Sequence, residues 1–339
     1  MGVYRIRASD FSVCLVGGGK CRRCRLKFPE AKAVVELFVK HGNLDMIRDG
    51  KDASFLKGGF CGGKVVGERI CVLPDGRKLN KAYSLFAPML TIHDEKSNSH
   101  WDVIFKNPNG KFAYLYDLKK VRLSTKGKYK KVEEFERCLP RLERNLMRAL
   151  DDDLIVLPML ILLKTKMRVG NEIYYLKNGH KGLTTLKKGD IKISGDNVTF
   201  DYIGKDGVPQ KITEKFSLKV VNELKNIIKG KKAGDFMFVD SGGHPLKDTQ
   251  FERAFLRYCG KKFYPHIVRS HYATKEAEKF LKKNPRVDKE KARKFCLALA
   301  DKLGHKKFSK KWGYWEDSYA VTLHHYIRPE LVERFGLVK

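Results

Sequence analysis

Long apolar runs are missing from this 339-residue chain. The longest, from Leu154 to Leu163, has ten residues with Pro158 inside it, whereas a membrane-spanning helix needs about 20. The first twenty residues also lack a sustained apolar core and a small-residue cleavage site. We therefore expect neither membrane insertion nor a secretion signal.

Motifs for nucleotide and metal chemistry are absent as well. The sequence has no P-loop, no GxGxxG after a strand, no HExxH and no acidic cluster with metal-ligand spacing. Chemistry driven by ATP or by two metal ions therefore has little support, and we expect no cofactor and no catalytic metal.

Cysteine is present but unevenly scattered, at positions 14, 21, 24, 61, 71, 138, 259 and 296. Because the chain has an intracellular character, this scatter argues against disulfides. Four of these residues, Cys21, Cys24, Cys61 and Cys71, offer thiolates for zinc, but the second pair lacks the spacing that such sites usually have. Zinc binding stays an alternative.

Acidic side chains are too few to balance the basic ones. The sequence has 70 Lys and Arg residues against 39 Asp and Glu residues, a formal net charge of +31. A polyanion would screen that charge, so nucleic acid is the expected partner, ahead of an anionic membrane. A basic enzyme without such a partner is the alternative.

Two regions differ in their hydrophobic patterns, and together they predict an α+β protein. Residues 1–125 are rich in glycine and short strand-like runs, which indicates a small, mainly β domain whose first 80 or so residues are Cys-rich and poorly assigned. The basic stretch 124–131 fits a linker. Residues 132–339 show helical spacing, which predicts a mainly α domain. The predicted strands are 64–72, 84–92, 101–105 and 112–116, and the predicted helical segments are 132–150, 154–163 and the stretch around 221–228.

A short β region interrupts the helical pattern of the second domain. The segments 190–194 and 198–203 flank the turn Gly195-Asp196-Asn197. A second tight turn at 204–207 precedes another extended stretch. Two successive tight turns predict a three-stranded meander.

An ordered series of polar residues offers phosphodiester chemistry without a metal. Such chemistry needs side chains that neutralise the charge around phosphorus, a nucleophile and an acid. The candidates, in chain order, are Arg168, Lys205, His266 and Arg269 in PHIVRSHYAT, His305 in Leu-Gly-His, and Tyr326 in HHYIRPEL. For Arg168 the alternative is a surface arginine at a helix end, and for Lys205 it is an ordinary exposed turn lysine.

This series resembles that of the type IB DNA topoisomerases, of the short poxvirus-like and bacterial kind. RVGNE (168–172) with GLTTL (182–186) is similar to a motif pair of that family, and IGKDGV (203–208) resembles its Gly-Lys hairpin. Lys205 follows Arg168 by 37 residues, as in the viral enzymes. Tyr326-Ile-Arg-Pro is similar to the surroundings of the nucleophile in bacterial members. The resemblance covers roughly residues 100–339.

Two positions depart from the family pattern. His266 stands where these topoisomerases usually have lysine and where the related tyrosine recombinases usually have histidine. The family places its nucleophile nine residues after the Gly-His histidine, but Tyr326 follows His305 by 21 residues, and a spacing of nine falls on Tyr314. We expect Tyr326 to be the nucleophile, with a 12-residue insertion within 306–319, and Tyr314 is the alternative.

The resemblance implies relaxation of supercoiled double-stranded DNA through a 3′-phosphotyrosyl intermediate, strand rotation and religation, without ATP or metal. It implies that Tyr326 attacks, that Arg168 and Arg269 hold the phosphate, that His305 donates a hydrogen bond and that Lys205 is the general acid. His266 is a further candidate.

The resemblance also implies a monomer whose two domains clamp the DNA, located inside the cell wherever that DNA lies. A tyrosine recombinase or integrase shares the polar series and is the alternative, with RVGNE and GLTTL favouring the topoisomerase. A non-enzymatic DNA-packaging protein would explain the charge alone.

Overall fold

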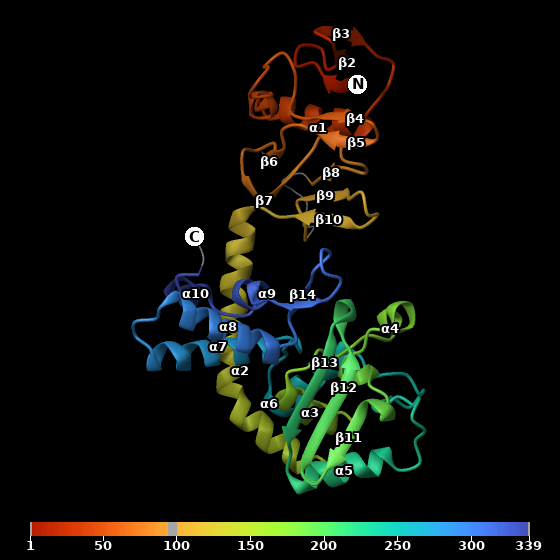
Figure 1. Cartoon of the computed structure of the whole chain (residues 1–339), viewed down its shortest axis with the longest axis vertical. Helices are drawn as coiled ribbons and strands as arrows, with labels where there is room; N and C mark the ends of the chain where they lie inside the picture. The colour runs from red at the N-terminus through yellow and green to blue at the C-terminus, as the bar shows by residue number, and fades with distance from the viewer. Residues whose placement is uncertain (1, 94–99, 338–339) are drawn as a thin grey trace. The chain divides into compact units, whose positions relative to one another are not determined.

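The computed structural model describes residues 2–93 and 100–337, and the chain divides into two compact units, 1–127 and 128–339 (Figure 1). The first unit is built mainly from antiparallel strands, in a five-stranded sheet of order β3-β2-β1-β4-β5, a three-stranded sheet of order β10-β9-β8 and the pair β6-β7. The strands are β1 (Val3–Ile6), β2 (Val13–Gly17), β3 (Lys20–Arg23), β4 (Gly59–Cys61), β5 (Lys64–Val66), β6 (Ile70–Val72), β7 (Lys78–Tyr83), β8 (Thr91–Ile92), β9 (Val103–Lys106) and β10 (Phe112–Leu115).

The mainly β character predicted for the first region is confirmed, with differences in detail. A helix, α1 (Pro29–Lys40), was not predicted; proline at its first turn sets the helical backbone angle, and Val34, Val35 and Phe38 fill the core. The run 64–72 forms two strands because Gly67 turns the chain with a φ of 77°. The run 84–92 is mostly buried, which accounts for its apolar residues, but only Thr91–Ile92 at its end forms a strand.

The second unit is mainly helical and contains the predicted three-stranded meander, in the order β11-β12-β13. Its strands are β11 (Ile191–Ser194), β12 (Asn197–Ile203), β13 (Pro209–Lys215), β14 (Lys306–Phe308) and β15 (Trp315–Asp317). The helices are α2 (Leu118–Arg148), α3 (Val156–Thr165), α4 (Glu172–Asn178), α5 (Leu218–Ile228), α6 (Asp248–Cys259), α7 (Ile267–Lys283), α8 (Lys289–Lys302), α9 (Ala320–His325) and α10 (Pro329–Arg334).

Helix α2 begins before residue 128, so it runs across the boundary between the two units. The basic stretch 124–131, interpreted as a linker from its composition, is therefore part of a helix. The sequence does not show this because the stretch contains glycine and few apolar residues, whereas Tyr129 and Val132 are buried in the core of the second unit.

Two apolar clusters support the second unit. Helix α3 is apolar on all sides and packs with the meander, where Val198 and Phe200 are fully buried. The other cluster joins α7 to α10, with small residues such as Ala273 and Ala277 allowing close packing. The start of α7 contributes Ile267 and Val268 to the first cluster, so this helix connects the two.

Two absences hold for the described residues. No helix within 2–93 and 100–337 is both long and apolar enough to cross a membrane. In the same ranges, no three His, Cys, Asp or Glu side chains gather as metal ligands would. Cys21, Cys24, Cys61 and Cys71 are accordingly not part of any such group among the described residues.

Candidate active site

The segment that carries Arg168 is held by the GLTTL motif. The chain leaves α3 through Lys166, whose φ is 57°, and Arg168 lies in the extended stretch beyond rather than at the helix end. Leu183 N donates to the carbonyl oxygen of Arg168 at 2.8 Å, and Thr184 N donates to that of Val169 at 2.6 Å. The two motifs therefore act as one backbone-paired support for a half-buried arginine.

Glycine is required where these motifs meet. Gly170 has a φ of 103°, and a Cβ on it would lie 2.8 Å from Thr185 Oγ1. A Cβ on Gly182 would lie 2.6 Å from Gly170 N. The next residue, Asn171, accepts a hydrogen bond from Tyr174 N and so caps α4. Within RVGNE, Gly170 thus makes a close backbone contact with Gly182, and Asn171 caps the start of helix α4.

Arg269 is buried and fixed by two helix ends. It lies in the first turn of α7 and is 3% exposed. Its Nη1 donates to the carbonyl oxygen of Lys166, after α3, at 2.5 Å, and its Nη2 donates to that of Leu303, after α8, at 2.6 Å. Carbonyls at helix C-termini carry partial negative charge, which stabilises a buried cation. Its Nε has no hydrogen-bond partner within the described structure.

His305 follows a glycine turn at the end of α8. Gly304 has a φ of 63° and ends the helix, and a Cβ there would lie 1.8 Å from Gln210 Oε1 of β13. His305 Nδ1 lies 2.7 Å from Thr322 Oγ1. His305 Nε2 lies 3.0 Å from Arg269 Nη2 and 3.4 Å from Arg168 Nη2.

These contacts define the tautomer of His305. Guanidinium groups only donate hydrogen bonds, so Nε2 accepts them. Nδ1 therefore carries the ring proton and donates a hydrogen bond to Thr322 Oγ1. Burial, followed by repulsion from Arg269 and Arg168, lowers the pKa of His305 to about 2. The ring is therefore neutral at physiological pH.

Tyr326 lies against this cluster, directly after α9. The ring is 7% exposed, and its centre is 4.8 Å from that of His305 and 5.3 Å from Arg269 Cζ. Burial raises the pKa of the Tyr326 hydroxyl, but Arg269 and Arg168 outweigh that effect, and the pKa is lowered from the usual value for tyrosine. The surroundings therefore favour the nucleophilic phenolate.

Tyr314 has different surroundings. It lies between β14 and β15 and is 55% exposed. The two strands pair from Lys306 opposite Asp317 to Phe308 opposite Trp315, so the interval that separates His305 from Tyr326 is largely a hairpin. This hairpin lies within residues 306–319, the interval in which the sequence predicts an insertion.

His266 precedes α7 and stacks near Tyr326, with ring centres 6.4 Å apart. Burial, followed by repulsion from Arg269 and Arg168, lowers its pKa to about 3. His266 is therefore a neutral neighbour of Tyr326, not a cation. The structure brings it together with the other candidates, as the spacing His-x-x-Arg predicts for one face of a helix.

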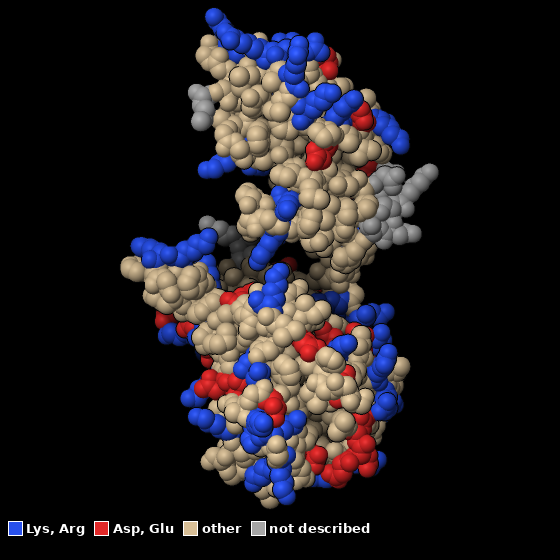
Figure 2. Space-filling view, turned by 90° about the vertical axis from the view of Figure 1, so that its right-hand side faces the viewer, with Lys and Arg blue, Asp and Glu red and all other residues tan. Residues whose placement is uncertain are grey.

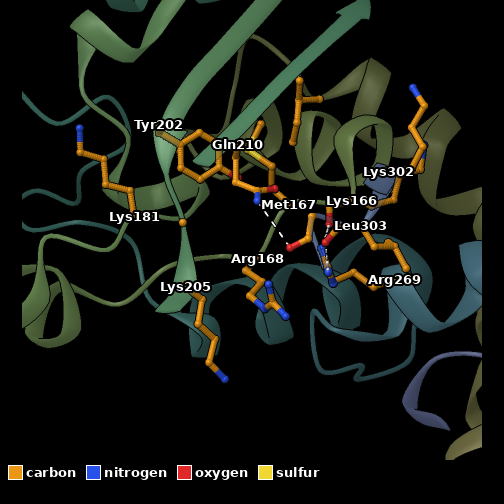
Figure 3. Close-up of a pocket in the computed structure, with 13 residues that line it drawn as sticks. Lys166, Met167, Arg168, Lys181, Tyr202, Lys205, Gln210, Arg269, Lys302 and Leu303 are labelled. Atoms are coloured by element: carbon orange, nitrogen blue, oxygen red, sulfur yellow. Dashed lines mark hydrogen bonds between the residues drawn. The ribbon is translucent and has the colours of Figure 1, made fainter. Parts of the chain in front are cut away.

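Lys205 reaches the cluster from the meander. It begins the turn between β12 and β13, is exposed, and lines a pocket together with Arg168 and Arg269. In Figure 3 the side chains of Lys205 and Arg168 extend toward the same side of the pocket. No Asp or Glu is among the described residues that line it. The pocket suits an anion with several oxygens, because two arginines and four lysines, Lys205 among them, line it.

Two residues of α2 support the Tyr326 segment and were not predicted. Lys128 Nζ donates a hydrogen bond to the carbonyl oxygen of His325 and lies 5.4 Å from the centre of the Tyr326 ring. Tyr129 Oη donates to the carbonyl oxygen of Ile327 at 2.6 Å. The Tyr129 contact spans 198 sequence positions, so no local pattern indicates it. Thr322 and Gln210 were missed for the same reason.

Basic side chains extend beyond the pocket. On the face shown in Figure 2, lysine and arginine cover parts of both units, while acidic side chains are most evident on the second unit. On this face the basic side chains are therefore spread over both units rather than confined to one patch.

Comparison with known proteins gives a family for most of the second unit. Residues 117–312 match the model described as the catalytic core of eukaryotic DNA topoisomerase I. This stretch includes Arg168, Lys205, Arg269 and His305 and ends before Tyr314 and Tyr326. The DNA topoisomerase 1B of Acanthamoeba polyphaga mimivirus is 28% identical over 116 residues, which are 32% of this chain and 34% of the viral protein. The match thus spans about a third of that relative's length.

Solved structures of the XerH site-specific recombinase bound to difH substrates are also similar to part of the chain. The post-cleavage complex has a TM-score of 0.35 and 17% identity, over 50% of this chain and 44% of the recombinase chain. The pre-cleavage complex has a TM-score of 0.35 and 16% identity, over 49% and 45% of the two chains.

Proposed function

This chain belongs to the family defined by the catalytic core of eukaryotic DNA topoisomerase I, and on that premise we propose that it relaxes supercoiled duplex DNA as a type IB topoisomerase. One observation carries the proposal: a buried tyrosine, Tyr326, with a lowered pKa lies against Arg269 and His305, next to a pocket that gathers positive charge. A phosphodiester is the anion that such a tyrosine attacks.

Cleavage begins when Tyr326 Oη attacks the phosphorus of one strand. The Oη–P bond forms and the P–O5′ bond breaks, which leaves a 3′-phosphotyrosyl link and a free 5′-hydroxyl. The phenolic proton passes to water, and Lys205 supplies a proton to the departing O5′. The exposed turn that carries Lys205 allows it to follow the leaving oxygen.

Arg168 and Arg269 stabilise the charge that develops on the nonbridging oxygens. The unpaired Nε of Arg269 and the half-buried guanidinium of Arg168 are the donors available for this role. Because Arg269 is fixed by two carbonyl groups before DNA binds, little reorganisation is needed in the transition state.

His305 changes its hydrogen bonds when the phosphate arrives. In the DNA-free arrangement Nε2 accepts from the arginines. Phosphate oxygens take over those donors and release Nε2. Nδ1 then loses its proton to water while Nε2 takes one up from water, so the ring stays neutral. The Thr322 hydroxyl donates a hydrogen bond to Nδ1 instead of accepting one, and Nε2–H donates a hydrogen bond to a phosphate oxygen. His266 assists as a neutral neighbour of the tyrosine.

The phosphotyrosyl link retains the energy of the broken bond, so religation needs no ATP. Torsion in the DNA drives rotation of the free strand before the 5′-hydroxyl attacks the link. We propose double-stranded DNA as the partner, held largely by lysine and arginine contacts to phosphates. We also propose a monomer whose domains, 1–125 and 132–339, clamp the duplex, at the intracellular location of that DNA.

Relaxation of a supercoiled plasmid in EDTA, without ATP, tests the proposal. We expect relaxed closed circles to form. Protein that binds the plasmid but leaves it supercoiled would contradict the proposal.

Tyrosine recombination is the second candidate, and His266 in the His-x-x-Arg segment favours it. Incubation with DNA that carries two copies of a sequence that the protein cleaves distinguishes the two functions. Recombinant products in place of relaxed circles would support the recombinase.

A further inference from the structure

The β14–β15 hairpin starts directly after His305, yet its tip contributes nothing to the site described above. Figure 1 shows this segment extending out from the helices of the second unit. From Lys306 to Trp315 it contains four lysines and no acidic residue. Two of these lysines, Lys310 and Lys311, lie at the tip, and no ion pair to them is formed within the described part of the chain.

Aromatic side chains accompany the lysines at the tip. Trp312 is 59% exposed and Tyr314 is 55% exposed, although large aromatic side chains of this kind are usually buried. Lys311 Nζ lies 4.5 Å from the centre of the Trp312 ring. A surface that joins exposed rings to unpaired lysines is complementary to nucleic acid, where phosphates meet apolar sugar and base edges.

The base of the hairpin packs next to the turn that carries Lys205, the proposed general acid. The rings of Phe308 and Trp315 pack edge to face, with centres 5.2 Å apart. The Trp315 ring also approaches Gly207, in the turn that begins with Lys205, so that a Cβ on Gly207 would lie 3.7 Å from Trp315 Cζ2. The tip therefore extends from a fixed base beside the pocket.

We propose that the β14–β15 hairpin is a DNA-binding ribbon that enters the major groove next to the cleaved phosphodiester, with Lys310 and Lys311 on phosphates and Trp312 and Tyr314 against the groove wall. This inference rests on the proposed function, because it takes duplex DNA as the ligand. A two-stranded β-ribbon fits a major groove about 12 Å wide. A strand of about four residues is roughly 13 Å long. The tip of the hairpin can therefore extend from His305, next to the cleaved phosphate, into the adjacent major groove.

The test compares DNA binding by hairpin variants and a matched control over a range of salt concentrations. Lys310→Ala/Lys311→Ala removes two charges from the tip, and Trp312→Ala removes a ring. Lys225→Ala/Lys229→Ala removes two exposed charges from the α5 region, at the other end of the unit (Figure 1). Affinity for a labelled duplex is measured by fluorescence anisotropy, and thermal melting checks that each variant is folded.

We expect the tip lysine variant to bind DNA about tenfold more weakly, with a slope of log affinity against log salt smaller by about two. Trp312→Ala should bind severalfold more weakly without a change in slope. The α5 variant should bind like the wild type, and single-turnover cleavage at saturating DNA should be unchanged in all three.

Two outcomes are separable. Tip variants with wild-type affinity and salt slope, or an α5 variant that loses as much affinity as the tip variant, overturn the ribbon proposal while wild-type relaxation stays intact. A wild-type protein that neither binds nor relaxes duplex DNA overturns the proposed function itself.

Discussion

The helical wall of the site, formed by Arg269, His305 and Tyr326, differs from the two turns beside it, which carry Lys205 and Tyr314. The wall is buried: these three side chains are at most 7% exposed, whereas Tyr314 is 55% exposed. The side chains of the wall are fixed by hydrogen bonds and ring contacts to distant parts of the chain, whereas Lys205 and Tyr314 in the turns are exposed to solvent.

This difference supports the proposed division of roles between the two regions. Burial alone would raise the pKa of Tyr326, but the charges of Arg269 and Arg168 outweigh that effect and lower it. A general acid, by contrast, must approach a leaving oxygen that only the bound DNA supplies, which suits an exposed turn. The following predictions test the comparison, from the largest expected effect to the smallest.

Tyr326→Phe should abolish the covalent protein–DNA adduct, because phenylalanine has no oxygen to attack phosphorus. Tyr314→Phe, its matched control in the exposed turn, should form the adduct as the wild type does. Denaturing gel electrophoresis of a labelled duplex after incubation measures both. If only Tyr314→Phe loses the adduct, the wall does not contain the nucleophile.

Lys205→Ala should slow single-turnover cleavage by about 10²- to 10⁴-fold, the usual contribution of a general acid, and leave DNA affinity almost unchanged. A substrate with sulfur at the bridging 5′ position should restore the rate, because a thiolate leaves without a proton. Equal losses of binding and cleavage, or no rescue by sulfur, would assign Lys205 to phosphate binding instead.

Thr322→Val should slow cleavage by about tenfold, because His305 Nδ1 would lose its buried partner and the switch of tautomer would be blocked. Thr322→Ser keeps the hydroxyl and should recover most of the rate. The comparison of single-turnover rates separates a hydrogen-bonding role from packing, since a valine variant with the wild-type rate and a slow serine variant would show that the methyl group matters rather than the hydroxyl.

Lys128→Met should give the smallest change, a shift of the pH–rate profile. A cation beside the Tyr326 ring favours phenolate, so its removal raises the pKa of Tyr326 and moves the rising limb of the profile to higher pH. At neutral pH cleavage should slow by about two- to fivefold, as for one charge about 5 Å away in a water-like dielectric. Lys128→Arg should keep the wild-type profile. A rate loss independent of pH would indicate that Lys128 only positions the segment.

The sequence predicts the local elements of the site well. The meander and the turn with Lys205 follow from two short turn signals, and the position of Arg269 next to His266 follows from helical spacing. The first unit is harder to predict, since α1 and the short strands depend on contacts within its core. The stretch 124–131 of helix α2 was interpreted as a linker because its packing partners are far away in the sequence, whereas the helical character of 132–148 was predicted.

The support of the site could not be predicted. Arg269 is bound to carbonyl groups of residues 166 and 303, and carbonyl groups are present in every residue, so no residue type marks the contact. The same holds for the carbonyl groups that accept from Lys128 and Tyr129. Side-chain chemistry indicates which groups react, whereas the backbone that aims them becomes visible only in the fold.

The antiparallel pairing of Lys306 with Asp317 has a consequence for how relatives of this chain are recognised. A hairpin returns to its starting point, so its two ends stay about 5 Å apart however many residues lie between them. Insertion at this position therefore lengthens the sequence between His305 and Tyr326 without separating them in space. Searches that require a fixed interval between these two residues will overlook proteins with hairpins of other lengths, whereas the Thr322 contact to His305 does not depend on that length.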